Sequence, residues 1–433
     1  MKIALVTHGT RGDVQPFVAL ALALMARGHD VWLGVPPNLM EFVRRCGVRA
    51  EPIPIDSQTF MESPEGKLWL ASGNVGAFMK QMSAVFHQHR AEIFKTYWGL
   101  TLSADLIISG LLTEDWLLPF AEKFGIPMIS VHLAVMRSTN CYPNVLVTTR
   151  KLPLQALNLL THSLADTLWW HGFRDDVNEF RHKLSLEKRK ASTSTQLAQR
   201  GAYTVHAFSP TLVPPPTDWG PRHPVVGAIA FPIEARQKLG EAVVDRHLAA
   251  WLQAGSKPIY FGLGSMPVER PQDMIQMVGE VTRALGVRAV IAAGWSRFET
   301  VQDLSGHLRL VGAVDHNWLL PQCQAAVHHG GAGTAFAVTS AGLPSVVCSV
   351  FADQPFWGVR LSQIGVGVHL PYKNLTAQGL EAALSQVLDA RMQEASAQLG
   401  VQLRTETDAV PKIVEIVEQV QATFRKATRA NSS

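Results

Sequence analysis

The stretch "AAVHHGGAGTAFAVTSAGLP", residues 325–344, decides the fold of the second half of the chain. A short apolar run, a glycine-rich turn and a longer apolar segment predict a strand, a tight turn and a helix. Free N–H groups at such a helix N-terminus, together with the helix dipole, predict a binding site for an anion such as phosphate. Adjacent strand side chains point to opposite faces, so His329, next to the glycines, is expected to face this site. The alternative is that His328 and His329 both bond buried carbonyl groups.

The same alternation of strand and helix runs through the chain. Strand-like segments such as "KIALVTHG" (2–9) and "ADLIISG" (104–110) recur as "KPIYFGLGS" (257–265) and "PSVVCSV" (344–350), with helical patterns between them. Short buried strands separated by helices predict an α/β fold with parallel sheets covered on both faces. The Pro-rich stretch 210–224 interrupts the alternation and suits a linker. We predict domains over 1–213 and 225–411, a linker over 214–224, and a terminal helix over 412–433 that packs back on the N-terminal domain.

Composition limits the classes of protein. The chain has 433 residues, enough for two or three domains, and 47% hydrophobic with 17% charged residues indicates packed globular structure. A net charge of +4 without a dense Lys/Arg run gives no support for a nucleic-acid partner. The four cysteines are scattered without a CxxC pair, which favours reduced thiols in a cytoplasmic protein. The apolar start breaks after six residues, so it predicts a first strand and not a signal peptide.

Polar residues follow two further strands of the second half. Asp353 and Gln354 come after "PSVVCSV", at a strand end where open α/β sheets bind ligands. An acid beside an amide offers acceptors and donors for several hydroxyl groups, as a sugar ring requires. The alternative for this pair is a helix N-cap before Pro355. Ser265, in the turn "FGLGSMP" (261–267), is a further candidate for phosphate contact.

The combination of motifs resembles a known family. The stretches "GLGSM" (262–266), "AGW" (293–295), "HNWLLPQCQAAVHHGGAGT" (316–334) and "DQPFWGVR" (353–360) are similar to the donor half of nucleotide-diphosphate-sugar glycosyltransferases of the GT-B fold. The similarity is greatest to the branch that holds UDP-glucose:sterol glucosyltransferases and bacterial antibiotic glycosyltransferases. "HGTRGDVQP" (8–16) and "FSPTLVPPPTDWG" (208–220) resemble the same branch, so the similarity runs nearly end to end. It implies two Rossmann-like domains facing across a cleft, with the acceptor in the first and the donor in the second.

The resemblance also implies roles for individual residues. His329 would meet the donor diphosphate, and Asp353 with Gln354 would hold the sugar hydroxyls. The remaining donor-binding residues that it implies are Gly12, Ser265, Trp295, Val314, Gly330, Gly331, Gly333 and Thr334. The expected co-substrate is a nucleotide-sugar, UDP-glucose, with no other cofactor; a dTDP-deoxysugar remains the alternative donor.

The catalytic base is expected to be Asp13. Transfer to a hydroxyl needs a base for the acceptor proton and stabilisation of the leaving diphosphate. The first strand ends in "THGTRGDVQP" (7–16) before a helix whose entry Pro16 marks, which places Asp13 at a cleft-facing strand end. A nearby helix N-terminus would lower the pKa of this carboxyl, whereas burial beneath an apolar acceptor would raise it. A helix-capping role is the alternative for Asp13, and His8, Asp115 and His132 are the other candidate bases.

The acceptor site is expected to be apolar and to belong to the first domain. Residues 60–100 are rich in Met and Phe, and the helical spacing of Trp170, Phe173, Val177, Phe180 and Leu184 forms one face. Such stripes suit either a plain core or an apolar cleft. The predicted acceptor-binding residues are His8, Phe78, Met82, Asp115, His132, Trp170 and Phe173. A sterol, triterpenoid, macrolide, phenolic compound or lipid would fit an apolar pocket equally well.

The sequence also bears on a metal ion, on other functions and on contact with a membrane. No DxD-like pair stands at a strand end, so a metal ion is not expected. An NAD-dependent oxidoreductase is disfavoured because "GTRGD" (9–13) is not GxGxxG and no acidic residue follows the second strand. A nucleotide-sugar epimerase would not need an apolar acceptor cleft, and a non-catalytic nucleotide-sugar or lipid-binding protein is the remaining alternative. The basic stretch "HKLSLEKRKAS" (182–192) is either a solvated helix end or a peripheral contact with anionic membrane.

Overall fold

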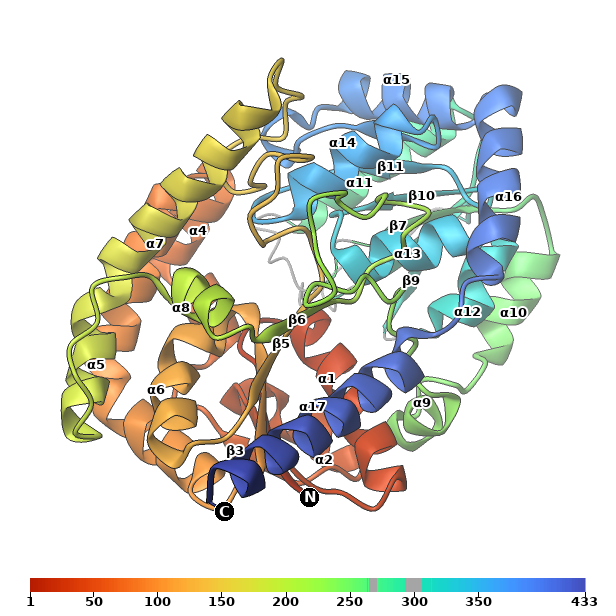
Figure 1. Ribbon diagram of the computed structural model, residues 1–433. Coiled ribbons are helices and arrows are strands. Elements are labelled where there is room, and N and C mark those ends of the chain that lie inside the picture. Colours follow the sequence, from red (N-terminus) through yellow and green to blue (C-terminus); the bar gives the residue numbers. More distant parts are fainter. Residues whose placement is uncertain (263, 265–270, 293, 295–305, 313, 433) are drawn as a thin grey trace.

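The computed structural model describes residues 1–432 apart from residues 263, 265–270, 293, 295–305 and 313. Within these residues, strands form two parallel sheets of six strands each (Figure 1). The first has the order β3-β2-β1-β4-β5-β6, from β1 (Lys2–Val6), β2 (Asp30–Val35), β3 (Ala50–Pro52), β4 (Leu106–Gly110), β5 (Met128–His132) and β6 (Tyr203–His206). The second has the order β12-β11-β10-β7-β8-β9, from β7 (Ile259–Gly262), β8 (Ala289–Ala292), β9 (Leu308–Val311), β10 (Ala325–His328), β11 (Ser345–Val347) and β12 (Gly367–His369).

Both sheets share one topology. In each, the first and fourth strands of the half lie side by side at the centre, as β1 with β4 and β7 with β10. Connections leave these central pairs in opposite directions, which opens a crevice at the carboxyl ends of the strands. The prediction of two Rossmann-like α/β domains with parallel sheets is therefore confirmed, and the crevices mark where ligands are expected.

The first sheet is buried on both faces. Alternate residues of β1 enter different cores: Ile3 and Leu5 pack in one cluster, and Ala4 and Val6 pack in the other. This explains why the strand reads as a continuous apolar run instead of alternating with polar residues. The covering helices are α1 (Arg11–Ala26), α2 (Met40–Arg45), α3 (Ser57–Glu62), α4 (Pro64–Ser72), α5 (Val75–Thr101), α6 (Glu114–Phe124), α7 (Gln155–Lys183) and α8 (Thr193–Gln199).

The second sheet is sandwiched in the same way. Ile259 and Phe261 of β7 pack in one cluster, and Tyr260 between them packs in the cluster on the other face. The helices of this half are α9 (Ile233–Leu239), α10 (Arg246–Gln253), α11 (Pro271–Ala284), α12 (His316–Leu319), α13 (Ala332–Ser340), α14 (Gln354–Gln363), α15 (Ala377–Val387), α16 (Ala390–Arg404) and α17 (Ala409–Ser432).

Two segments of the second half return to the first core. In Figure 1 the dark blue helix α17 lies along the red N-terminal helices, and its Ile413 and Val417 pack in the same cluster as Leu5. Val225 forms a bridge with His206 beside β6. Ala235 of α9 packs in the same cluster as Leu5. The first core is thus completed by residues that follow the Pro-rich stretch.

Candidate functional site

His328 and His329 have different surroundings. His328 ends β10 and is fully buried, and its Nδ1 accepts a hydrogen bond from the backbone N–H of Gly330 at 3.1 Å. This bond holds the turn that leads into α13, whose N-cap is Gly331. His329 follows the strand and is only partly buried. Because His328 accepts an N–H group, the alternative in which both histidines bond carbonyl groups does not describe this turn.

Glycines surround the His329 imidazole closely. A Cβ at Gly264, where φ is +61°, would lie 2.6 Å from Cε1 of His329, and a Cβ at Gly331 would lie 2.5 Å from Nε2. A Cβ at Gly294 would lie 2.0 Å from the Gly264 carbonyl oxygen. The turns after β7 and β10 therefore meet at one imidazole with no room for a Cβ at Gly264 or Gly331, and Gly294 after β8 packs against Gly264.

The remaining donor-binding candidates lie at the same edge or outside the described residues. Gly333 is exposed and Thr334 is partly buried in the first turn of α13, where backbone N–H groups lack helical partners. Val314 is partly buried and packs against the cluster that contains Tyr260. Ser265 and Trp295 lie outside the described residues. Gly12 is exposed in the first turn of α1, in the other half of the molecule.

Burial keeps the His329 imidazole neutral at physiological pH. It lowers the pKa of His329 to about 4, although the Gly262 backbone opposes the shift. Nδ1 of His329 makes no hydrogen bond of standard geometry within the described part of the chain. A neutral imidazole can donate one hydrogen bond to an anion, so positive potential at this edge comes from the N-terminus of α13.

Asp353 and Gln354 are fixed by their own loop. Asp353 is the N-cap residue of α14, and its Oδ2 accepts a hydrogen bond from Nε1 of Trp357 at 2.9 Å. Gln354 is buried, and its Oε1 accepts the backbone N–H of Val350 at 2.8 Å. Burial raises the pKa of Asp353 above its ordinary value. The sequence reasoning missed Trp357, although its spacing of four residues from Asp353 on a helix was visible.

Asp13 lies inside the first turn of α1 and not before the helix. The helix begins at Arg11, five residues earlier than Pro16, so the expected helix entry was wrong. Oδ2 of Asp13 accepts the backbone N–H of Thr10 at 2.7 Å, and the Thr10 hydroxyl accepts the N–H of Gly12 at 3.2 Å. This reciprocal capping box stabilises the helix start. The helix-capping role that the sequence analysis gave as the alternative for Asp13 is therefore present.

Burial dominates the electrostatics of Asp13. It raises the pKa of Asp13 to about 6; the hydrogen bond from Thr10 opposes the shift, and the charge of Asp353 adds to it. Asp13 belongs to the first half and Asp353 to the second, so these two carboxyl groups influence each other across the halves. The backbone N–H and the hydroxyl of Thr10 both donate to Oδ2 of Asp13, so the carboxyl is oriented by the residue that caps the helix.

Most residues predicted to bind the acceptor lie in the core of the first half. Met82, Trp170 and Phe173 are buried in the cluster among α5, α6 and α7. His8 is also buried; its Nε2 lies 3.2 Å from the Ile55 carbonyl oxygen, and burial lowers its pKa to about 4. Phe78 is partly buried; it packs against this cluster and also against Trp69 and Phe351. In this structure the stripe on α7 is core packing.

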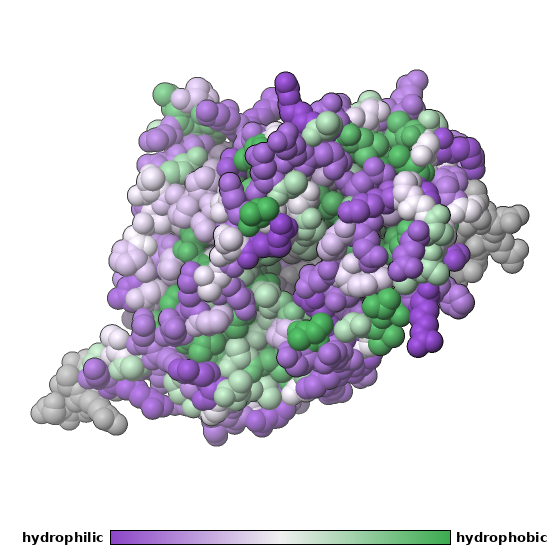
Figure 2. Space-filling view, turned by 90° about the vertical axis from the view of Figure 1, so that its right-hand side faces the viewer, coloured by the Kyte–Doolittle hydropathy of each residue, from purple (hydrophilic) through white to green (hydrophobic). Residues whose placement is uncertain are grey.

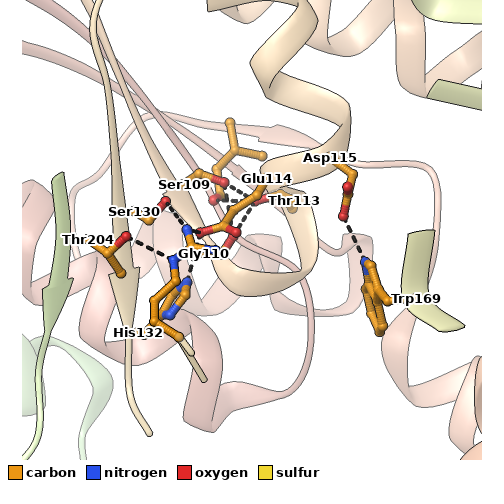
Figure 3. Close-up of polar contacts among 11 residues, drawn as sticks. Ser109, Gly110, Thr113, Glu114, Asp115, Ser130, His132, Trp169 and Thr204 are labelled. Carbon is orange, nitrogen blue, oxygen red and sulfur yellow. Dashed lines mark hydrogen bonds and ion pairs between the residues drawn. The ribbon is translucent and has the colours of Figure 1, made fainter. Parts of the chain in front are cut away.

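Asp115 and His132 belong to buried polar groups that bond other residues of the first half. Nε2 of His132 lies 2.7 Å from Oε1 of Glu114, which also accepts a hydrogen bond from Arg137 at 2.7 Å. Burial alone would raise the pKa of Glu114, but Arg137 and His132 lower it to about 2. Figure 3 shows that the adjacent Asp115 points away from this group toward Trp169, whose Nε1 donates to it at 2.7 Å. Glu114 and Arg137 were not predicted from the sequence.

An ion pair joins the two halves beside Asp13. Arg11 donates to both carboxylate oxygens of Glu241, at 2.6 and 2.7 Å. Figure 2 shows that the displayed face is hollowed near the centre, with both hydrophobic and hydrophilic residues around the hollow. An acid in the first half and a neutral histidine in the second suit transfer of a group from a charged donor to a hydroxyl group.

Two family models match this chain. Residues 3–140 match the glycosyltransferase family 28 N-terminal domain, and residues 276–423 match the erythromycin biosynthesis protein CIII-like, C-terminal domain. An uncharacterised glycosyltransferase of Mycobacterium bovis is 31% identical over 90% of this chain and 91% of its own length. A sterol 3-beta-glucosyltransferase of Arabidopsis thaliana is 32% identical over 94% of this chain, which spans 63% of the plant protein.

Solved structures agree on the fold. The glycosyltransferase VinC, crystallised with dTDP, superposes with a TM-score of 0.66 over 98% of this chain and all of its own, at 18% identity. The glycosyltransferase of kitacinnamycin superposes with a TM-score of 0.65 over 97% of this chain and 99% of its own, also at 18% identity. The chain therefore belongs to the glycosyltransferases that combine these two domains, and it has the GT-B fold.

Proposed function

We propose that this glycosyltransferase is an inverting enzyme that moves a hexose, glucose from UDP-glucose, to a hydroxyl group of a hydrophobic acceptor such as a sterol, triterpenoid, macrolide or lipid. Asp13 takes the acceptor proton while the acceptor oxygen attacks the anomeric carbon. The bond from that carbon to the diphosphate breaks, and His329 with the N-terminus of α13 binds the leaving group. Attack from the face opposite the diphosphate inverts the anomeric configuration.

The observation that carries this proposal is the environment of Asp13. A general base works best when its pKa lies near the operating pH, and burial raises the pKa of Asp13 to about 6. Asp13 follows β1 and His329 follows β10, so each residue lies at the central strand pair of its own sheet. Both positions are those where doubly wound sheets bind ligands.

The donor is proposed as UDP-glucose because a relative is named a sterol 3-beta-glucosyltransferase. The structure of VinC with dTDP supports a dTDP-deoxysugar as the alternative donor.

Metal independence stays a prediction. Excess EDTA should leave the transfer rate unchanged, and a rate that falls with EDTA and is restored by Mg²⁺ would contradict it.

Peripheral contact with a membrane, from a cytoplasmic location, is also part of the proposal. Among the helices of the described residues, none combines the length and hydropathy of a membrane span. One of the four Lys and Arg side chains of the stretch 182–192 is not free for lipid, since Arg189 is buried against Glu122. Exposed leucines along α7 and on α4 offer a better contact, namely Leu68, Leu154, Leu159, Leu160, Leu164 and Leu168. Replacing Leu160 and Leu164 by serine should reduce sedimentation with phosphatidylglycerol vesicles, and unchanged sedimentation would contradict this contact.

The test of the function is release of UDP from UDP-glucose, and of dTDP from dTDP-sugars, against a panel of apolar alcohols. Wild type is compared with Asp13→Ala and His329→Ala. We expect one donor–acceptor pair to turn over and both variants to lose on the order of 100-fold or more in kcat. An unimpaired Asp13→Ala variant would exclude Asp13 as base. Binding of a nucleotide-sugar without turnover with any acceptor would reopen the acceptor class.

A further inference from the structure

An aromatic cluster joins the two halves next to the loop that carries Asp353. Trp69 of α4 and Phe78 of α5 come from the first half, and Phe351 comes from the second. Ring centroids lie 4.9 Å apart for Trp69 and Phe351, 5.5 Å apart for Phe78 and Phe351, and 4.9 Å apart for Trp69 and Phe78. These separations and the tilted or edge-on angles are those at which aromatic pairs stabilise contacts.

Phe351 lies in a constrained loop between β11 and α14. The next residue, Ala352, has φ +58°, a left-handed conformation that non-glycine residues hold only when their surroundings fix it. Oε1 of Gln354 accepts the backbone N–H groups of Val350 at 2.8 Å and of Phe351 at 3.4 Å. Asp353 follows directly, so the position of its carboxylate depends on the shape of this loop.

The loop is held from two sides. On its own sheet, the Ser349 hydroxyl lies 2.7 Å from Nε2 of His369 in β12. On the other side, Gly73 ends α4 with φ +64°, and a Cβ at Gly73 would lie 3.3 Å from the Val350 carbonyl oxygen. Trp69, only 2% exposed, fills the space beside Gly73 and Phe351. The first half of the molecule is therefore part of the support of a second-half loop.

We propose that Trp69, Phe78 and Phe351 form an interdomain clamp, in which Phe351 is a positioning residue that fixes Asp353 for the sugar hydroxyls of the donor. This inference rests on the proposed role of Asp353. The three clamp residues are distinct from the residues of the diphosphate site, which His329 and α13 form after β10, with the Gln354 backbone lying beside Gly330 of that turn. The clamp thus governs affinity for the sugar part of the donor and not for the nucleotide part.

The first test compares two ligands by isothermal titration calorimetry. Phe351→Leu and Trp69→Leu are measured beside Phe94→Leu, which alters another partly buried aromatic of α5 that packs against Trp98 and Phe120. We expect the Kd of UDP-glucose to rise about 10-fold in both clamp variants, while the Kd of UDP stays within about twofold of wild type. The control should bind both ligands like wild type. An unchanged Kd for UDP-glucose, or an equal loss for UDP, would overturn the clamp.

The second test needs no donor. In hydrogen–deuterium exchange of the ligand-free protein, the amides of Val350 and Phe351 should exchange faster in Trp69→Leu than in wild type or in Phe94→Leu. Equal exchange in all three proteins would overturn the clamp. Wild type that binds neither UDP-glucose nor UDP would instead overturn the proposed donor, and the exchange measurement would still decide whether the clamp exists.

Discussion

Asp13 is subject to two opposing influences that set the pH at which it can accept a proton. The helix start and Thr10 stabilise its charged form, while burial and the charge of Asp353 favour the protonated form and prevail, giving a pKa of about 6. A base must be deprotonated, so kcat/KM of the wild type should fall about 10-fold per pH unit below pH 6. The measurement is the pH profile of kcat/KM between pH 4.5 and 8.

Asp353→Asn should shift this profile as well as weaken donor binding. Removing its negative charge lowers the pKa of Asp13, so the acidic limb should move to lower pH. Asp175→Asn, at an exposed position on α7, is the matched control and should leave the midpoint in place. An acidic limb that Asp353→Asn does not move would show that another group controls it.

Gly9 makes room for the Asp13 carboxyl. Its φ is +133°, and a Cβ there would lie 2.2 Å from Oδ2 of Asp13. Gly9→Ala should therefore displace Asp13, cost about 2 kcal/mol or more of unfolding free energy, and lower kcat. Gly28→Ala is the control, because Gly28 also has positive φ (+79°) but no atom within 4 Å of its Cβ position. It should cost only about 1 kcal/mol and leave kcat unchanged. Equal effects on kcat would contradict the role of Gly9.

At the scale of elements, the N-terminus of α13 is organised around His329. Gly331 has ordinary φ (−61°), so Gly331→Ala adds no backbone strain, but the new Cβ would lie 2.5 Å from Nε2 of His329. We expect Gly331→Ala to raise the Kd of UDP on the order of 10-fold. Gly333→Ala changes the same helix turn at a position with no atom within 4 Å, and should leave the ligand-free protein equally or more stable.

The measurement is UDP titration of both variants together with thermal unfolding. A Kd unchanged by Gly331→Ala would show that the position of the imidazole does not matter for diphosphate binding.

At the scale of the whole molecule, buried histidines make the fold sensitive to acid. Burial lowers the pKa of His132, His206 and His223 below the ordinary value, most of all for His206, which stacks on Trp219 at 3.8 Å. Neither ring nitrogen of His206 has a hydrogen-bond partner within the described residues. The unfolded chain binds protons more readily at these sites, so stability is full above pH 6.5 and falls as the pH drops below it.

His206→Phe should relieve part of this sensitivity. The variant keeps an aromatic ring against Trp219 and removes a group that must stay uncharged in the fold. Its gain in unfolding free energy over wild type should be greater at pH 5 than at pH 7.5, by up to about 2 kcal/mol. Urea unfolding at both pH values measures this, with His247→Phe, at an exposed position, as control. The same gain at both pH values would mean that titration of His206 does not contribute to the loss of stability in acid.

The sequence by itself determined the fold class and the elements that carry the candidate site. Apolar runs separated by helical patterns sufficed to predict both parallel sheets, because strands buried on both faces must be apolar throughout. The glycine-rich turn after "AAVHH" predicted a helix N-terminus beside His329, since local chemistry sets such turns. The family was also recognisable, because its motifs are short and contiguous along the chain.

Only the tertiary structure decided which segments, distant along the chain, contact each other. The same α7 periodicity fits a core and a cleft, and contact with α5 and α6 made Trp170 and Phe173 core residues. The pKa of Asp13 depends on burial and on Asp353, which lies 340 positions later. No local pattern could therefore predict whether this pKa is raised or lowered. The packing of Trp69 against Phe351 likewise arises only when the two halves meet. Burial and charge act through space, whereas sequence patterns report mainly on neighbours along the chain.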